Sequence, residues 1–210
     1  MIINSSNLDK WAHKGHVFGE CMSRPDSDLM YVNIPKNASS WTKPNLLDWG
    51  WEFYNYHTDQ LDKTAIVVLR DPVDRWLSGI AEYLTLYHPN FGNGEWTEHV
   101  FDIIFDTITF DDHTEQQVKF LQGLDTDRCV FFRCDQYYRE DFSTFLDERG
   151  MANRYHRYEY QHVSENDPIR HNFKELFKAT IQNSKYLDNV KRHFAADYDL
   201  INSVKYYGSR

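Results

Sequence analysis

Three short, uninterrupted apolar runs constrain the fold of this chain more than any other feature. They are LMYVNI at 29–34, AIVVLR at 65–70 and CVFFRC at 129–134, and a polar turn follows each of them. Continuous apolar residues are typical of strands that are buried on both faces of a sheet. A weaker fourth candidate strand, EFYNYH at 52–57, carries alternating aromatic residues.

Segments with helical periodicity lie between and after these runs. They are 72–87, 96–108, 113–124 and 141–150, followed by two helices across roughly 170 to 204. Strands that alternate with helices form parallel β-α-β units, so we expect a three-layer α/β fold. After the first strand we expect one helical turn at 38–42 and a restart near Thr42 or Lys43, because Pro44 fits best in a first turn.

Length and composition fit a single domain. The chain has 210 residues, of which 41% are hydrophobic and 16% aromatic, and this is enough for a packed core. We expect one domain over 1–210, with 1–28 as an N-terminal extension. The start of the chain lacks the basic-then-apolar pattern of a signal peptide, and no apolar run approaches the ~20 residues that span a bilayer. We therefore expect a soluble, cytoplasmic protein without a membrane partner.

Charge and cysteine content exclude several other classes of protein. A net charge of -9 argues against a general nucleic-acid binder, although a few basic residues in one cleft can still bind an anion. The three cysteines, Cys21, Cys129 and Cys134, show no CxxC pattern and no regular spacing. A disulfide framework or a zinc knuckle does not fit such an arrangement, and we expect no metal site.

The first loop whose residues could bind a ligand is IPKNASSW at 34–41. In open α/β sheets, ligands bind at the carboxyl ends of strands, where the N–H groups of helix N-termini point outward. Here the loop would offer backbone amides, the point charge of Lys36 and the hydroxyls of Ser39 and Ser40, which is the chemistry of a phosphate cradle. It is no Walker A loop, because GxxxxGK[ST] is absent. The alternative is an ordinary surface turn with a solvated lysine.

A second motif, VVLRDPVDRWLSG at 67–79, follows the next buried strand. The strand delivers Arg70 to its carboxyl end, and Ser78 comes two helical turns later. Arginine is suited to bidentate recognition of a phosphate. The same letters also describe a helix start, with Asp71 as N-cap and Pro72 in the first helical position. Both interpretations are compatible, since the cap would fix the helix that positions the motif.

Together the two motifs resemble those of PAPS-dependent sulfotransferases, most closely the carbohydrate sulfotransferases. IPKNASSW is similar to the 5′-phosphosulfate-binding loop of that family, and LRDPVDRWLSG to its 3′-phosphate-binding motif. The segments HTEQQVKFL, CVFFRCDQYYREDFSTFLDERG and FAADYDLI also resemble later parts of these enzymes, so that the likeness covers about 29 to 205. It implies a P-loop-like fold, with a central parallel sheet flanked by helices and a helical C-terminal part.

The resemblance implies in-line transfer of a sulfuryl group from PAPS to a hydroxyl, which leaves the product PAP and needs no metal. The acceptor would be a small molecule or glycan, a carbohydrate or another alcohol, and not a nucleic acid. Lys36 would have the main catalytic role. The cofactor contacts carried over from the motifs are Lys36, Asn37, Ala38, Ser39, Ser40, Trp41, Arg70 and Ser78. Arg75 would be a second contact or a surface helix residue.

The general base is expected after the first helix, within WGWEFYNYHTDQLDK at 49–63. His57 is our first choice, because an imidazole with a pKa near ~6.5 can accept a proton at neutral pH. Glu52 and Asp59 are rivals, and Glu52 would need a pKa raised by burial. His113 is a further candidate. Glu52, His113 and Glu115 are also candidate contacts of the acceptor, although polar residues at 113–115 are equally expected at a helix start.

Two other functions compete with this hypothesis. A P-loop nucleotide or sugar kinase would share the strand-loop-helix cradle, but its Gly-rich GK[ST] loop is missing. A non-catalytic PAP(S)-binding protein would keep the cradle without a base. The loop 87–96 is either a mobile segment beside a site or a long turn. The stretch that contains His162 and Ser164 resembles a late segment that lies near the cofactor in sulfotransferases.

Overall fold

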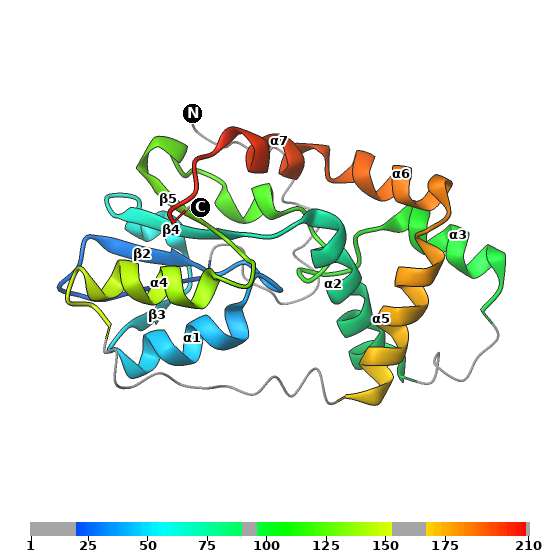
Figure 1. The fold of residues 1–210 in the computed structure, drawn as a ribbon, viewed down its shortest axis with the longest axis horizontal. Helices are drawn as coiled ribbons and strands as arrows, with labels where there is room; N and C mark the ends of the chain where they lie inside the picture. Colours follow the sequence, from blue (N-terminus) through cyan, green and yellow to red (C-terminus); the bar gives the residue numbers. More distant parts are fainter. Residues whose placement is uncertain (1–19, 90–95, 153–166, 209–210) are drawn as a thin grey trace. The chain divides into compact units, whose positions relative to one another are not determined.

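The computed structural model describes residues 20–89, 96–152 and 167–208 (Figure 1). Within these ranges the chain forms two compact units. The sheet unit comprises 20–70, 117–152 and 200–208, and the helical unit comprises 71–89, 96–116 and 167–199. The chain thus leaves the sheet unit after Arg70 and returns to it at Gln117. The loop 87–96 falls largely outside the described residues, as do His162 and Ser164.

The sheet unit contains five strands in the order β3-β1-β2-β4-β5. These are β1 (Cys21–Ser23), β2 (Leu29–Val32), β3 (Glu52–Tyr54), β4 (Thr64–Leu69) and β5 (Cys129–Arg133). The three apolar runs form β2, β4 and β5, which pair in parallel as predicted. β1, however, pairs antiparallel with both β2 and β3, so the sheet is mixed rather than wholly parallel.

β1 was not predicted, because its three residues CMS show neither an apolar run nor an alternating pattern. Its position in the sheet comes from pairing with β2, in which Cys21 lies opposite Val32 and Ser23 opposite Met30. Because β1 is antiparallel to both of its neighbours, β2 and β3 run in the same direction. Since β2, β4 and β5 are parallel, the carboxyl ends of β2, β3, β4 and β5 all lie at the same edge of the sheet. We call it the carboxyl edge.

Helices α1 (Ser39–Asp48) and α4 (Tyr138–Asp147) cover one face of the sheet (Figure 1). Their contact is aromatic: the ring of Trp41 packs edge-on against those of Tyr138 and Phe142, at 5.9 and 6.2 Å between centroids. The other face is covered by two 3-10 helices, η2 (His57–Gln60) and η4 (Gln117–Leu121), and by the second half of α7 (Ala195–Ser203). The sheet unit is therefore a three-layer α/β structure.

α1 is one continuous helix with Pro44 inside it, so the predicted break near Thr42 is wrong. Proline cannot donate the i→i−4 bond, but four buried residues on one side of α1 hold the helix against the sheet: Trp41, Thr42, Asn45 and Leu46. The side chain of Asn45 also donates to the Trp41 carbonyl at 2.8 Å. Tertiary packing here outweighs the cost of the proline.

The helical unit contains α2 (Pro72–Tyr87), α3 (Glu98–Thr107), α5 (Pro168–Thr180), α6 (Ser184–His193) and the first half of α7. α2 has the predicted bounds, and its start is capped as predicted: Asp71 Oδ1 accepts from the Asp74 N–H at 3.0 Å. The core is again aromatic, with the Trp76 ring 5.2 Å from Phe105 and 6.0 Å from Phe177. The C-terminal part forms three helices instead of the two that we expected.

The predicted helix at 113–124 is also wrong, because 111–116 form turns and only η4 follows. Local side chains compete with the helical backbone there: the Thr114 hydroxyl accepts from the N–H groups of Phe110 and Asp111, at 2.8 and 3.0 Å. In addition, the buried guanidinium of Arg75 donates hydrogen bonds to the carbonyls of Asp112 and Glu115. In the described parts of the chain, no helix is long and apolar enough to cross a membrane.

Candidate anion-binding site

The loop between β2 and α1 has an unusual backbone. Lys36 and Ala38 have φ angles of 69° and 60°, in the left-handed region that non-glycine residues rarely adopt. Such strain concentrates at functional sites, and backbones that alternate between left- and right-handed residues form anion-binding concavities. Ala38 is the N-cap of α1 and provides no capping side chain. The positive end of the helix dipole therefore lies directly beside Lys36.

Asn37 fixes this loop to the sheet. Its side chain is fully buried, and its Nδ2 donates to the carbonyl of Val68 at 2.7 Å and to Oε1 of Gln117 at 2.6 Å. Because both amide protons serve the protein itself, we expect a cofactor to contact the backbone of Asn37 rather than its Nδ2 group.

The structure brings the two sequence motifs together at the carboxyl edge. Nη1 of Arg70, which follows directly after β4, donates to the carbonyl of Lys36 at 3.1 Å. Gln117 joins them from a third segment: its Oε1 accepts from the Arg70 N–H at 3.0 Å, and its Nε2 donates to the Arg70 carbonyl at 2.9 Å. Gln117 was not among the predicted site residues. Only its place in the HTEQQVKFL segment could have drawn attention to it.

The remaining residues of the first motif divide into two kinds. Ser39 and Ser40 are half-buried in the first turn of α1. Trp41 has only 4% of its surface exposed, and its ring belongs to the aromatic core. The guanidinium of Arg139, at the start of α4, lies over this ring at 5.7 Å. It adds a positive group beside α1 that the sequence did not indicate.

Ser78 and Arg75 belong to the helical unit, whereas Lys36 and Arg70 belong to the sheet unit. Ser78 is half-buried on α2. Arg75 is 1% exposed, so the interpretation as a surface residue is wrong. Burial disfavours its charge and lowers its pKa to about 10, although the nearby carboxylates, above all that of Asp197, favour the charge. The contacts of Arg75 to the Asp112 and Glu115 carbonyls give it a structural role in this unit.

His57, the expected base, is packed against the backbone. Its side chain belongs to η2 and is 3% exposed, and its Nε2 lies 2.7 Å from the carbonyl of Gln122. Nε2 must therefore carry the proton, while Nδ1 is buried and has no hydrogen-bond partner among the described residues. The rivals Glu52 and Asp59 are exposed, so the burial that Glu52 would need is not met.

His113 and Glu115 lie in the turns of the helical unit. Nδ1 of His113 is 2.9 Å from Oδ2 of Asp111 and 3.0 Å from Oδ1 of Asp112. Burial opposes the imidazolium charge, but these two carboxylates outweigh it and raise the pKa to about 9. His113 is therefore a cation at neutral pH and cannot accept a proton there. Glu115 is fully buried, and its carboxylate accepts from the Gln116 N–H at 2.8 Å.

The cluster of Asp111, Asp112 and His113 could in principle hold a metal ion, since ligand atoms of all three lie within 4.8 Å of one another. In this structure Nδ1 of His113 lies within hydrogen-bond distance of one oxygen of each carboxylate, at 2.9 and 3.0 Å. The cluster is thus satisfied as an internal ion pair.

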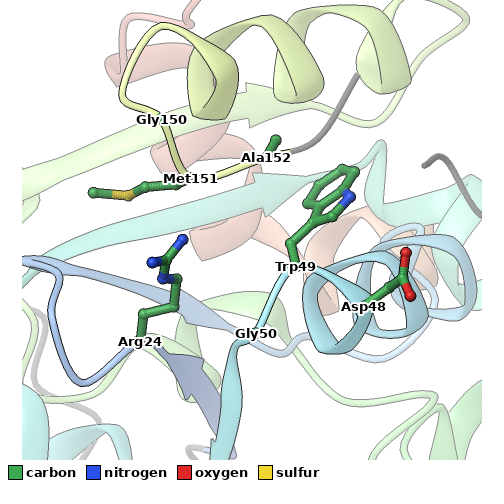
Figure 2. Close-up of a pocket in the computed structure, with 7 residues that line it drawn as sticks. All are labelled: Arg24, Asp48, Trp49, Gly50, Gly150, Met151 and Ala152. Atoms are coloured by element: carbon green, nitrogen blue, oxygen red, sulfur yellow. The ribbon is translucent and has the colours of Figure 1, made fainter. Parts of the chain in front are cut away.

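A cavity of about 520 Å³ lies at the opposite edge of the sheet, where α1 and α4 end (Figure 2). Its lining residues are Arg24, Asp48, Trp49, Gly50, Gly150, Met151 and Ala152. Arg24 is already bound to the Asp26 carboxylate through two hydrogen bonds, at 3.0 and 2.8 Å. Because the cavity lies at the opposite edge of the sheet, it is separate from the Lys36 loop. The cationic side chain that lines it, that of Arg24, is engaged within the protein.

No protein-family model, no curated protein and no solved structure matches this chain. The interpretation of the site consequently depends on its own geometry. One edge of the sheet presents the strained Lys36 loop, the N-terminus of α1 and the Arg70 guanidinium, and the buried amides of Asn37 and Gln117 bond the Lys36 loop and the Arg70 backbone there. Such an arrangement can bind a phosphate or sulfate group and stabilise negative charge that develops on it.

Proposed function

We propose that this protein is a PAPS-dependent sulfotransferase that acts on the hydroxyl of a carbohydrate or another alcohol. The observation that carries the proposal is the hydrogen bond from Arg70 Nη1 to the Lys36 carbonyl, at 3.1 Å. It joins the two loops that resemble the 5′-phosphosulfate and 3′-phosphate motifs of the family, although the motifs are far apart in the sequence. A P-loop-like arrangement of β2, the loop and α1 is part of this proposal.

The roles follow from the charges. Lys36 and the amides of the loop would hold the 5′-phosphosulfate, and the Lys36 ammonium would stabilise the charge on the bridging oxygen as the sulfur-oxygen bond breaks. Arg70 would hold the 3′-phosphate that distinguishes PAPS from an ordinary adenylate. The acceptor oxygen attacks the sulfur in line, its proton passes to a base, and PAP leaves.

The base is the group that takes the proton of the acceptor hydroxyl. His57 can serve as the base through Nδ1, which carries the lone pair, only if the acceptor hydroxyl reaches this buried atom. The packed position of His57 favours a second candidate function, a PAP(S)-binding protein without turnover. Transfer of label from PAPS to an acceptor distinguishes the two candidate functions, because a sulfotransferase transfers the label and a binding protein does not.

Binding of PAP, compared with AMP and ATP by thermal shift, tests the assignment of the cofactor. A ligand at 100 times its Kd stabilises a protein by ~2.7 kcal/mol, which is a readily measured shift. We expect PAP to stabilise the protein at concentrations at which AMP does not. Equal effects of PAP and AMP would overturn the sulfotransferase proposal, and a preference for ATP with magnesium would favour the kinase.

Transfer of label from PAPS to a panel of sugar and alcohol acceptors tests catalysis. We expect Lys36→Ala to abolish transfer. Lys43→Ala is the matched control, because Lys43 is also half-buried but lies within α1, outside the Lys36 loop, where it forms an ion pair with Glu20 at 3.5 Å. Lys36→Gly, which suits the positive φ, should likewise be inactive but folded. Normal transfer by either Lys36 variant would contradict the assigned role.

A further inference from the structure

Gln117 holds a special position at the carboxyl edge. Its side-chain amide makes three hydrogen bonds to the two loops of the candidate site: one from Asn37 Nδ2 at 2.6 Å, and two with the backbone of Arg70, at 3.0 and 2.9 Å. The residue has no exposed surface. A buried amide with such partners is costly to remove, because each group that it leaves behind loses its hydrogen bond without gaining one to water.

The bonds from Gln117 to the Arg70 backbone lie just beyond the end of strand β4. The ladder between β4 and β5 ends at the pair of Leu69 and Arg133, and the Leu69 carbonyl accepts from the Cys134 N–H at 2.7 Å. Arg70 comes directly after this last pair. Both of its backbone groups are bonded to Gln117 instead of to a strand. The side chain of Gln117 therefore sets the orientation of the Arg70 backbone and the position from which the Arg70 side chain extends.

The same amide also sets the other loop. Asn37 lies between the two strained residues, Lys36 and Ala38, and its Nδ2 group bonds both the Val68 carbonyl and Gln117. A change at Gln117 thus acts on the loop that presents Lys36 as well as on Arg70. Since Arg70 has both backbone groups on this amide and the Lys36 loop keeps its bond to Val68, we expect Arg70 to be affected more.

We propose that Gln117 is a positioning residue that fixes the distance between Arg70 and the Lys36 loop, and so makes the site selective for a nucleotide with two separated phosphate groups. This inference rests on the proposed function. A nucleotide with a single 5′-phosphate needs only the Lys36 loop. A nucleotide with an additional 3′-phosphate needs Arg70 at a defined distance from that loop.

Two variants test the proposal, with PAP and AMP as probes and calorimetry as the measurement. Gln117→Leu removes all three hydrogen bonds at similar volume. We expect it to weaken the binding of PAP about tenfold or more, which is the effect of losing one or two buried hydrogen bonds. The affinity for AMP should change far less. Ser23→Ala is the control: Ser23 is also fully buried and bonds the Leu29 carbonyl at 2.8 Å, but it lies at the opposite edge of the sheet. It should lower stability without changing the ratio of PAP to AMP affinity.

Gln117→Glu gives a readout that a purely structural role would not produce. A protonated carboxyl reproduces the amide, because its O–H can donate to the Arg70 carbonyl while its other oxygen accepts from Arg70 and Asn37. Burial raises the pKa of such a carboxyl, so the donor should be lost as the pH rises through neutrality. We expect the preference of this variant for PAP, divided by that of the wild type at the same pH so that the titration of the ligand phosphates cancels, to be near one at pH 5.5 and to fall by pH 8.

The outcomes separate the two proposals. A wild type without preference for PAP overturns the proposed function, and this inference with it. A wild type that prefers PAP, together with a Gln117→Leu variant that keeps this preference, overturns this inference alone. If Gln117→Leu does not fold, Gln117→Glu decides, since a preference for PAP that equals the wild type's at every pH would equally refute a positioning role.

Discussion

His113 should make the stability of the helical unit depend on pH above neutrality. Its Nδ1 lies between the carboxylates of Asp111 and Asp112, which outweigh the effect of burial and raise its pKa from 6.5 to about 9. Because the pKa is higher in the folded than in the unfolded chain, the ion pair stabilises the fold fully below pH 6.5. This contribution decreases as the pH rises and is nearly lost at the folded pKa of about 9.

The magnitude follows from the same values. At 1.36 kcal/mol for each pKa unit, the difference between 6.5 and about 9 corresponds to about 3 kcal/mol. That is a large part of the net stability of a typical domain, which is about 5–15 kcal/mol. It should therefore be visible in equilibrium unfolding. Measurements are best kept at or below pH 9, since the pKa of Arg75, lowered to about 10 by burial, is reached above that range.

The assay compares the wild type with His113→Gln by urea unfolding at pH 6, 7.5 and 9. We expect the wild type to be about 3 kcal/mol more stable at pH 6 and the two chains to differ by less than about 1 kcal/mol at pH 9. Titrating groups that do not contact His113 are common to both chains and cancel in the difference, and Asp111 and Asp112 stay ionised over most of this pH range. NMR titration of the imidazole signals, with the variant to assign the His113 resonance, gives the pKa directly.

Two results would refute this reasoning. One is a stability difference between the two chains that stays constant from pH 6 to pH 9. The other is a His113 signal that titrates at or below 6.5, which would mean that the carboxylates do not outweigh burial. The second result would also restore His113 as a candidate base.

Two further predictions concern packing and thiol chemistry. Gly79→Ala should destabilise the helical unit by at least about 1–3 kcal/mol in urea unfolding, because an added Cβ would lie 2.1 Å from the backbone oxygen of His113; unchanged stability would contradict this close approach of α2 to the turns. The three thiols should react slowly with Ellman's reagent at pH 8 and completely after unfolding, because burial raises the pKa of Cys21 and Cys129 to about 12 and also raises that of Cys134; three fast-reacting thiols in the folded chain would show otherwise.

Part of the candidate site could be predicted from the sequence because its signals are local. The two motifs follow apolar runs directly, and parallel strands bring their carboxyl ends to one edge, so Lys36 and Arg70 were expected at the same place. The other residues around the site were not recognisable in this way. Gln117 acts through hydrogen bonds to segments far away in the chain, and Arg139 reaches the start of α1 only because α4 packs beside it.

The sequence by itself determined β2, β4 and β5, together with α2 and its Asp71 cap, because apolar runs, periodicity and capping residues are properties of neighbouring positions. Only the tertiary structure decided the rest. β1 exists through its pairing with β2 and β3, and the helix predicted at 113–124 is replaced by turns because Arg75 and Thr114 take up its backbone groups. His57 is packed against Gln122 for the same physical reason: burial and hydrogen bonding between distant segments outweigh local preference.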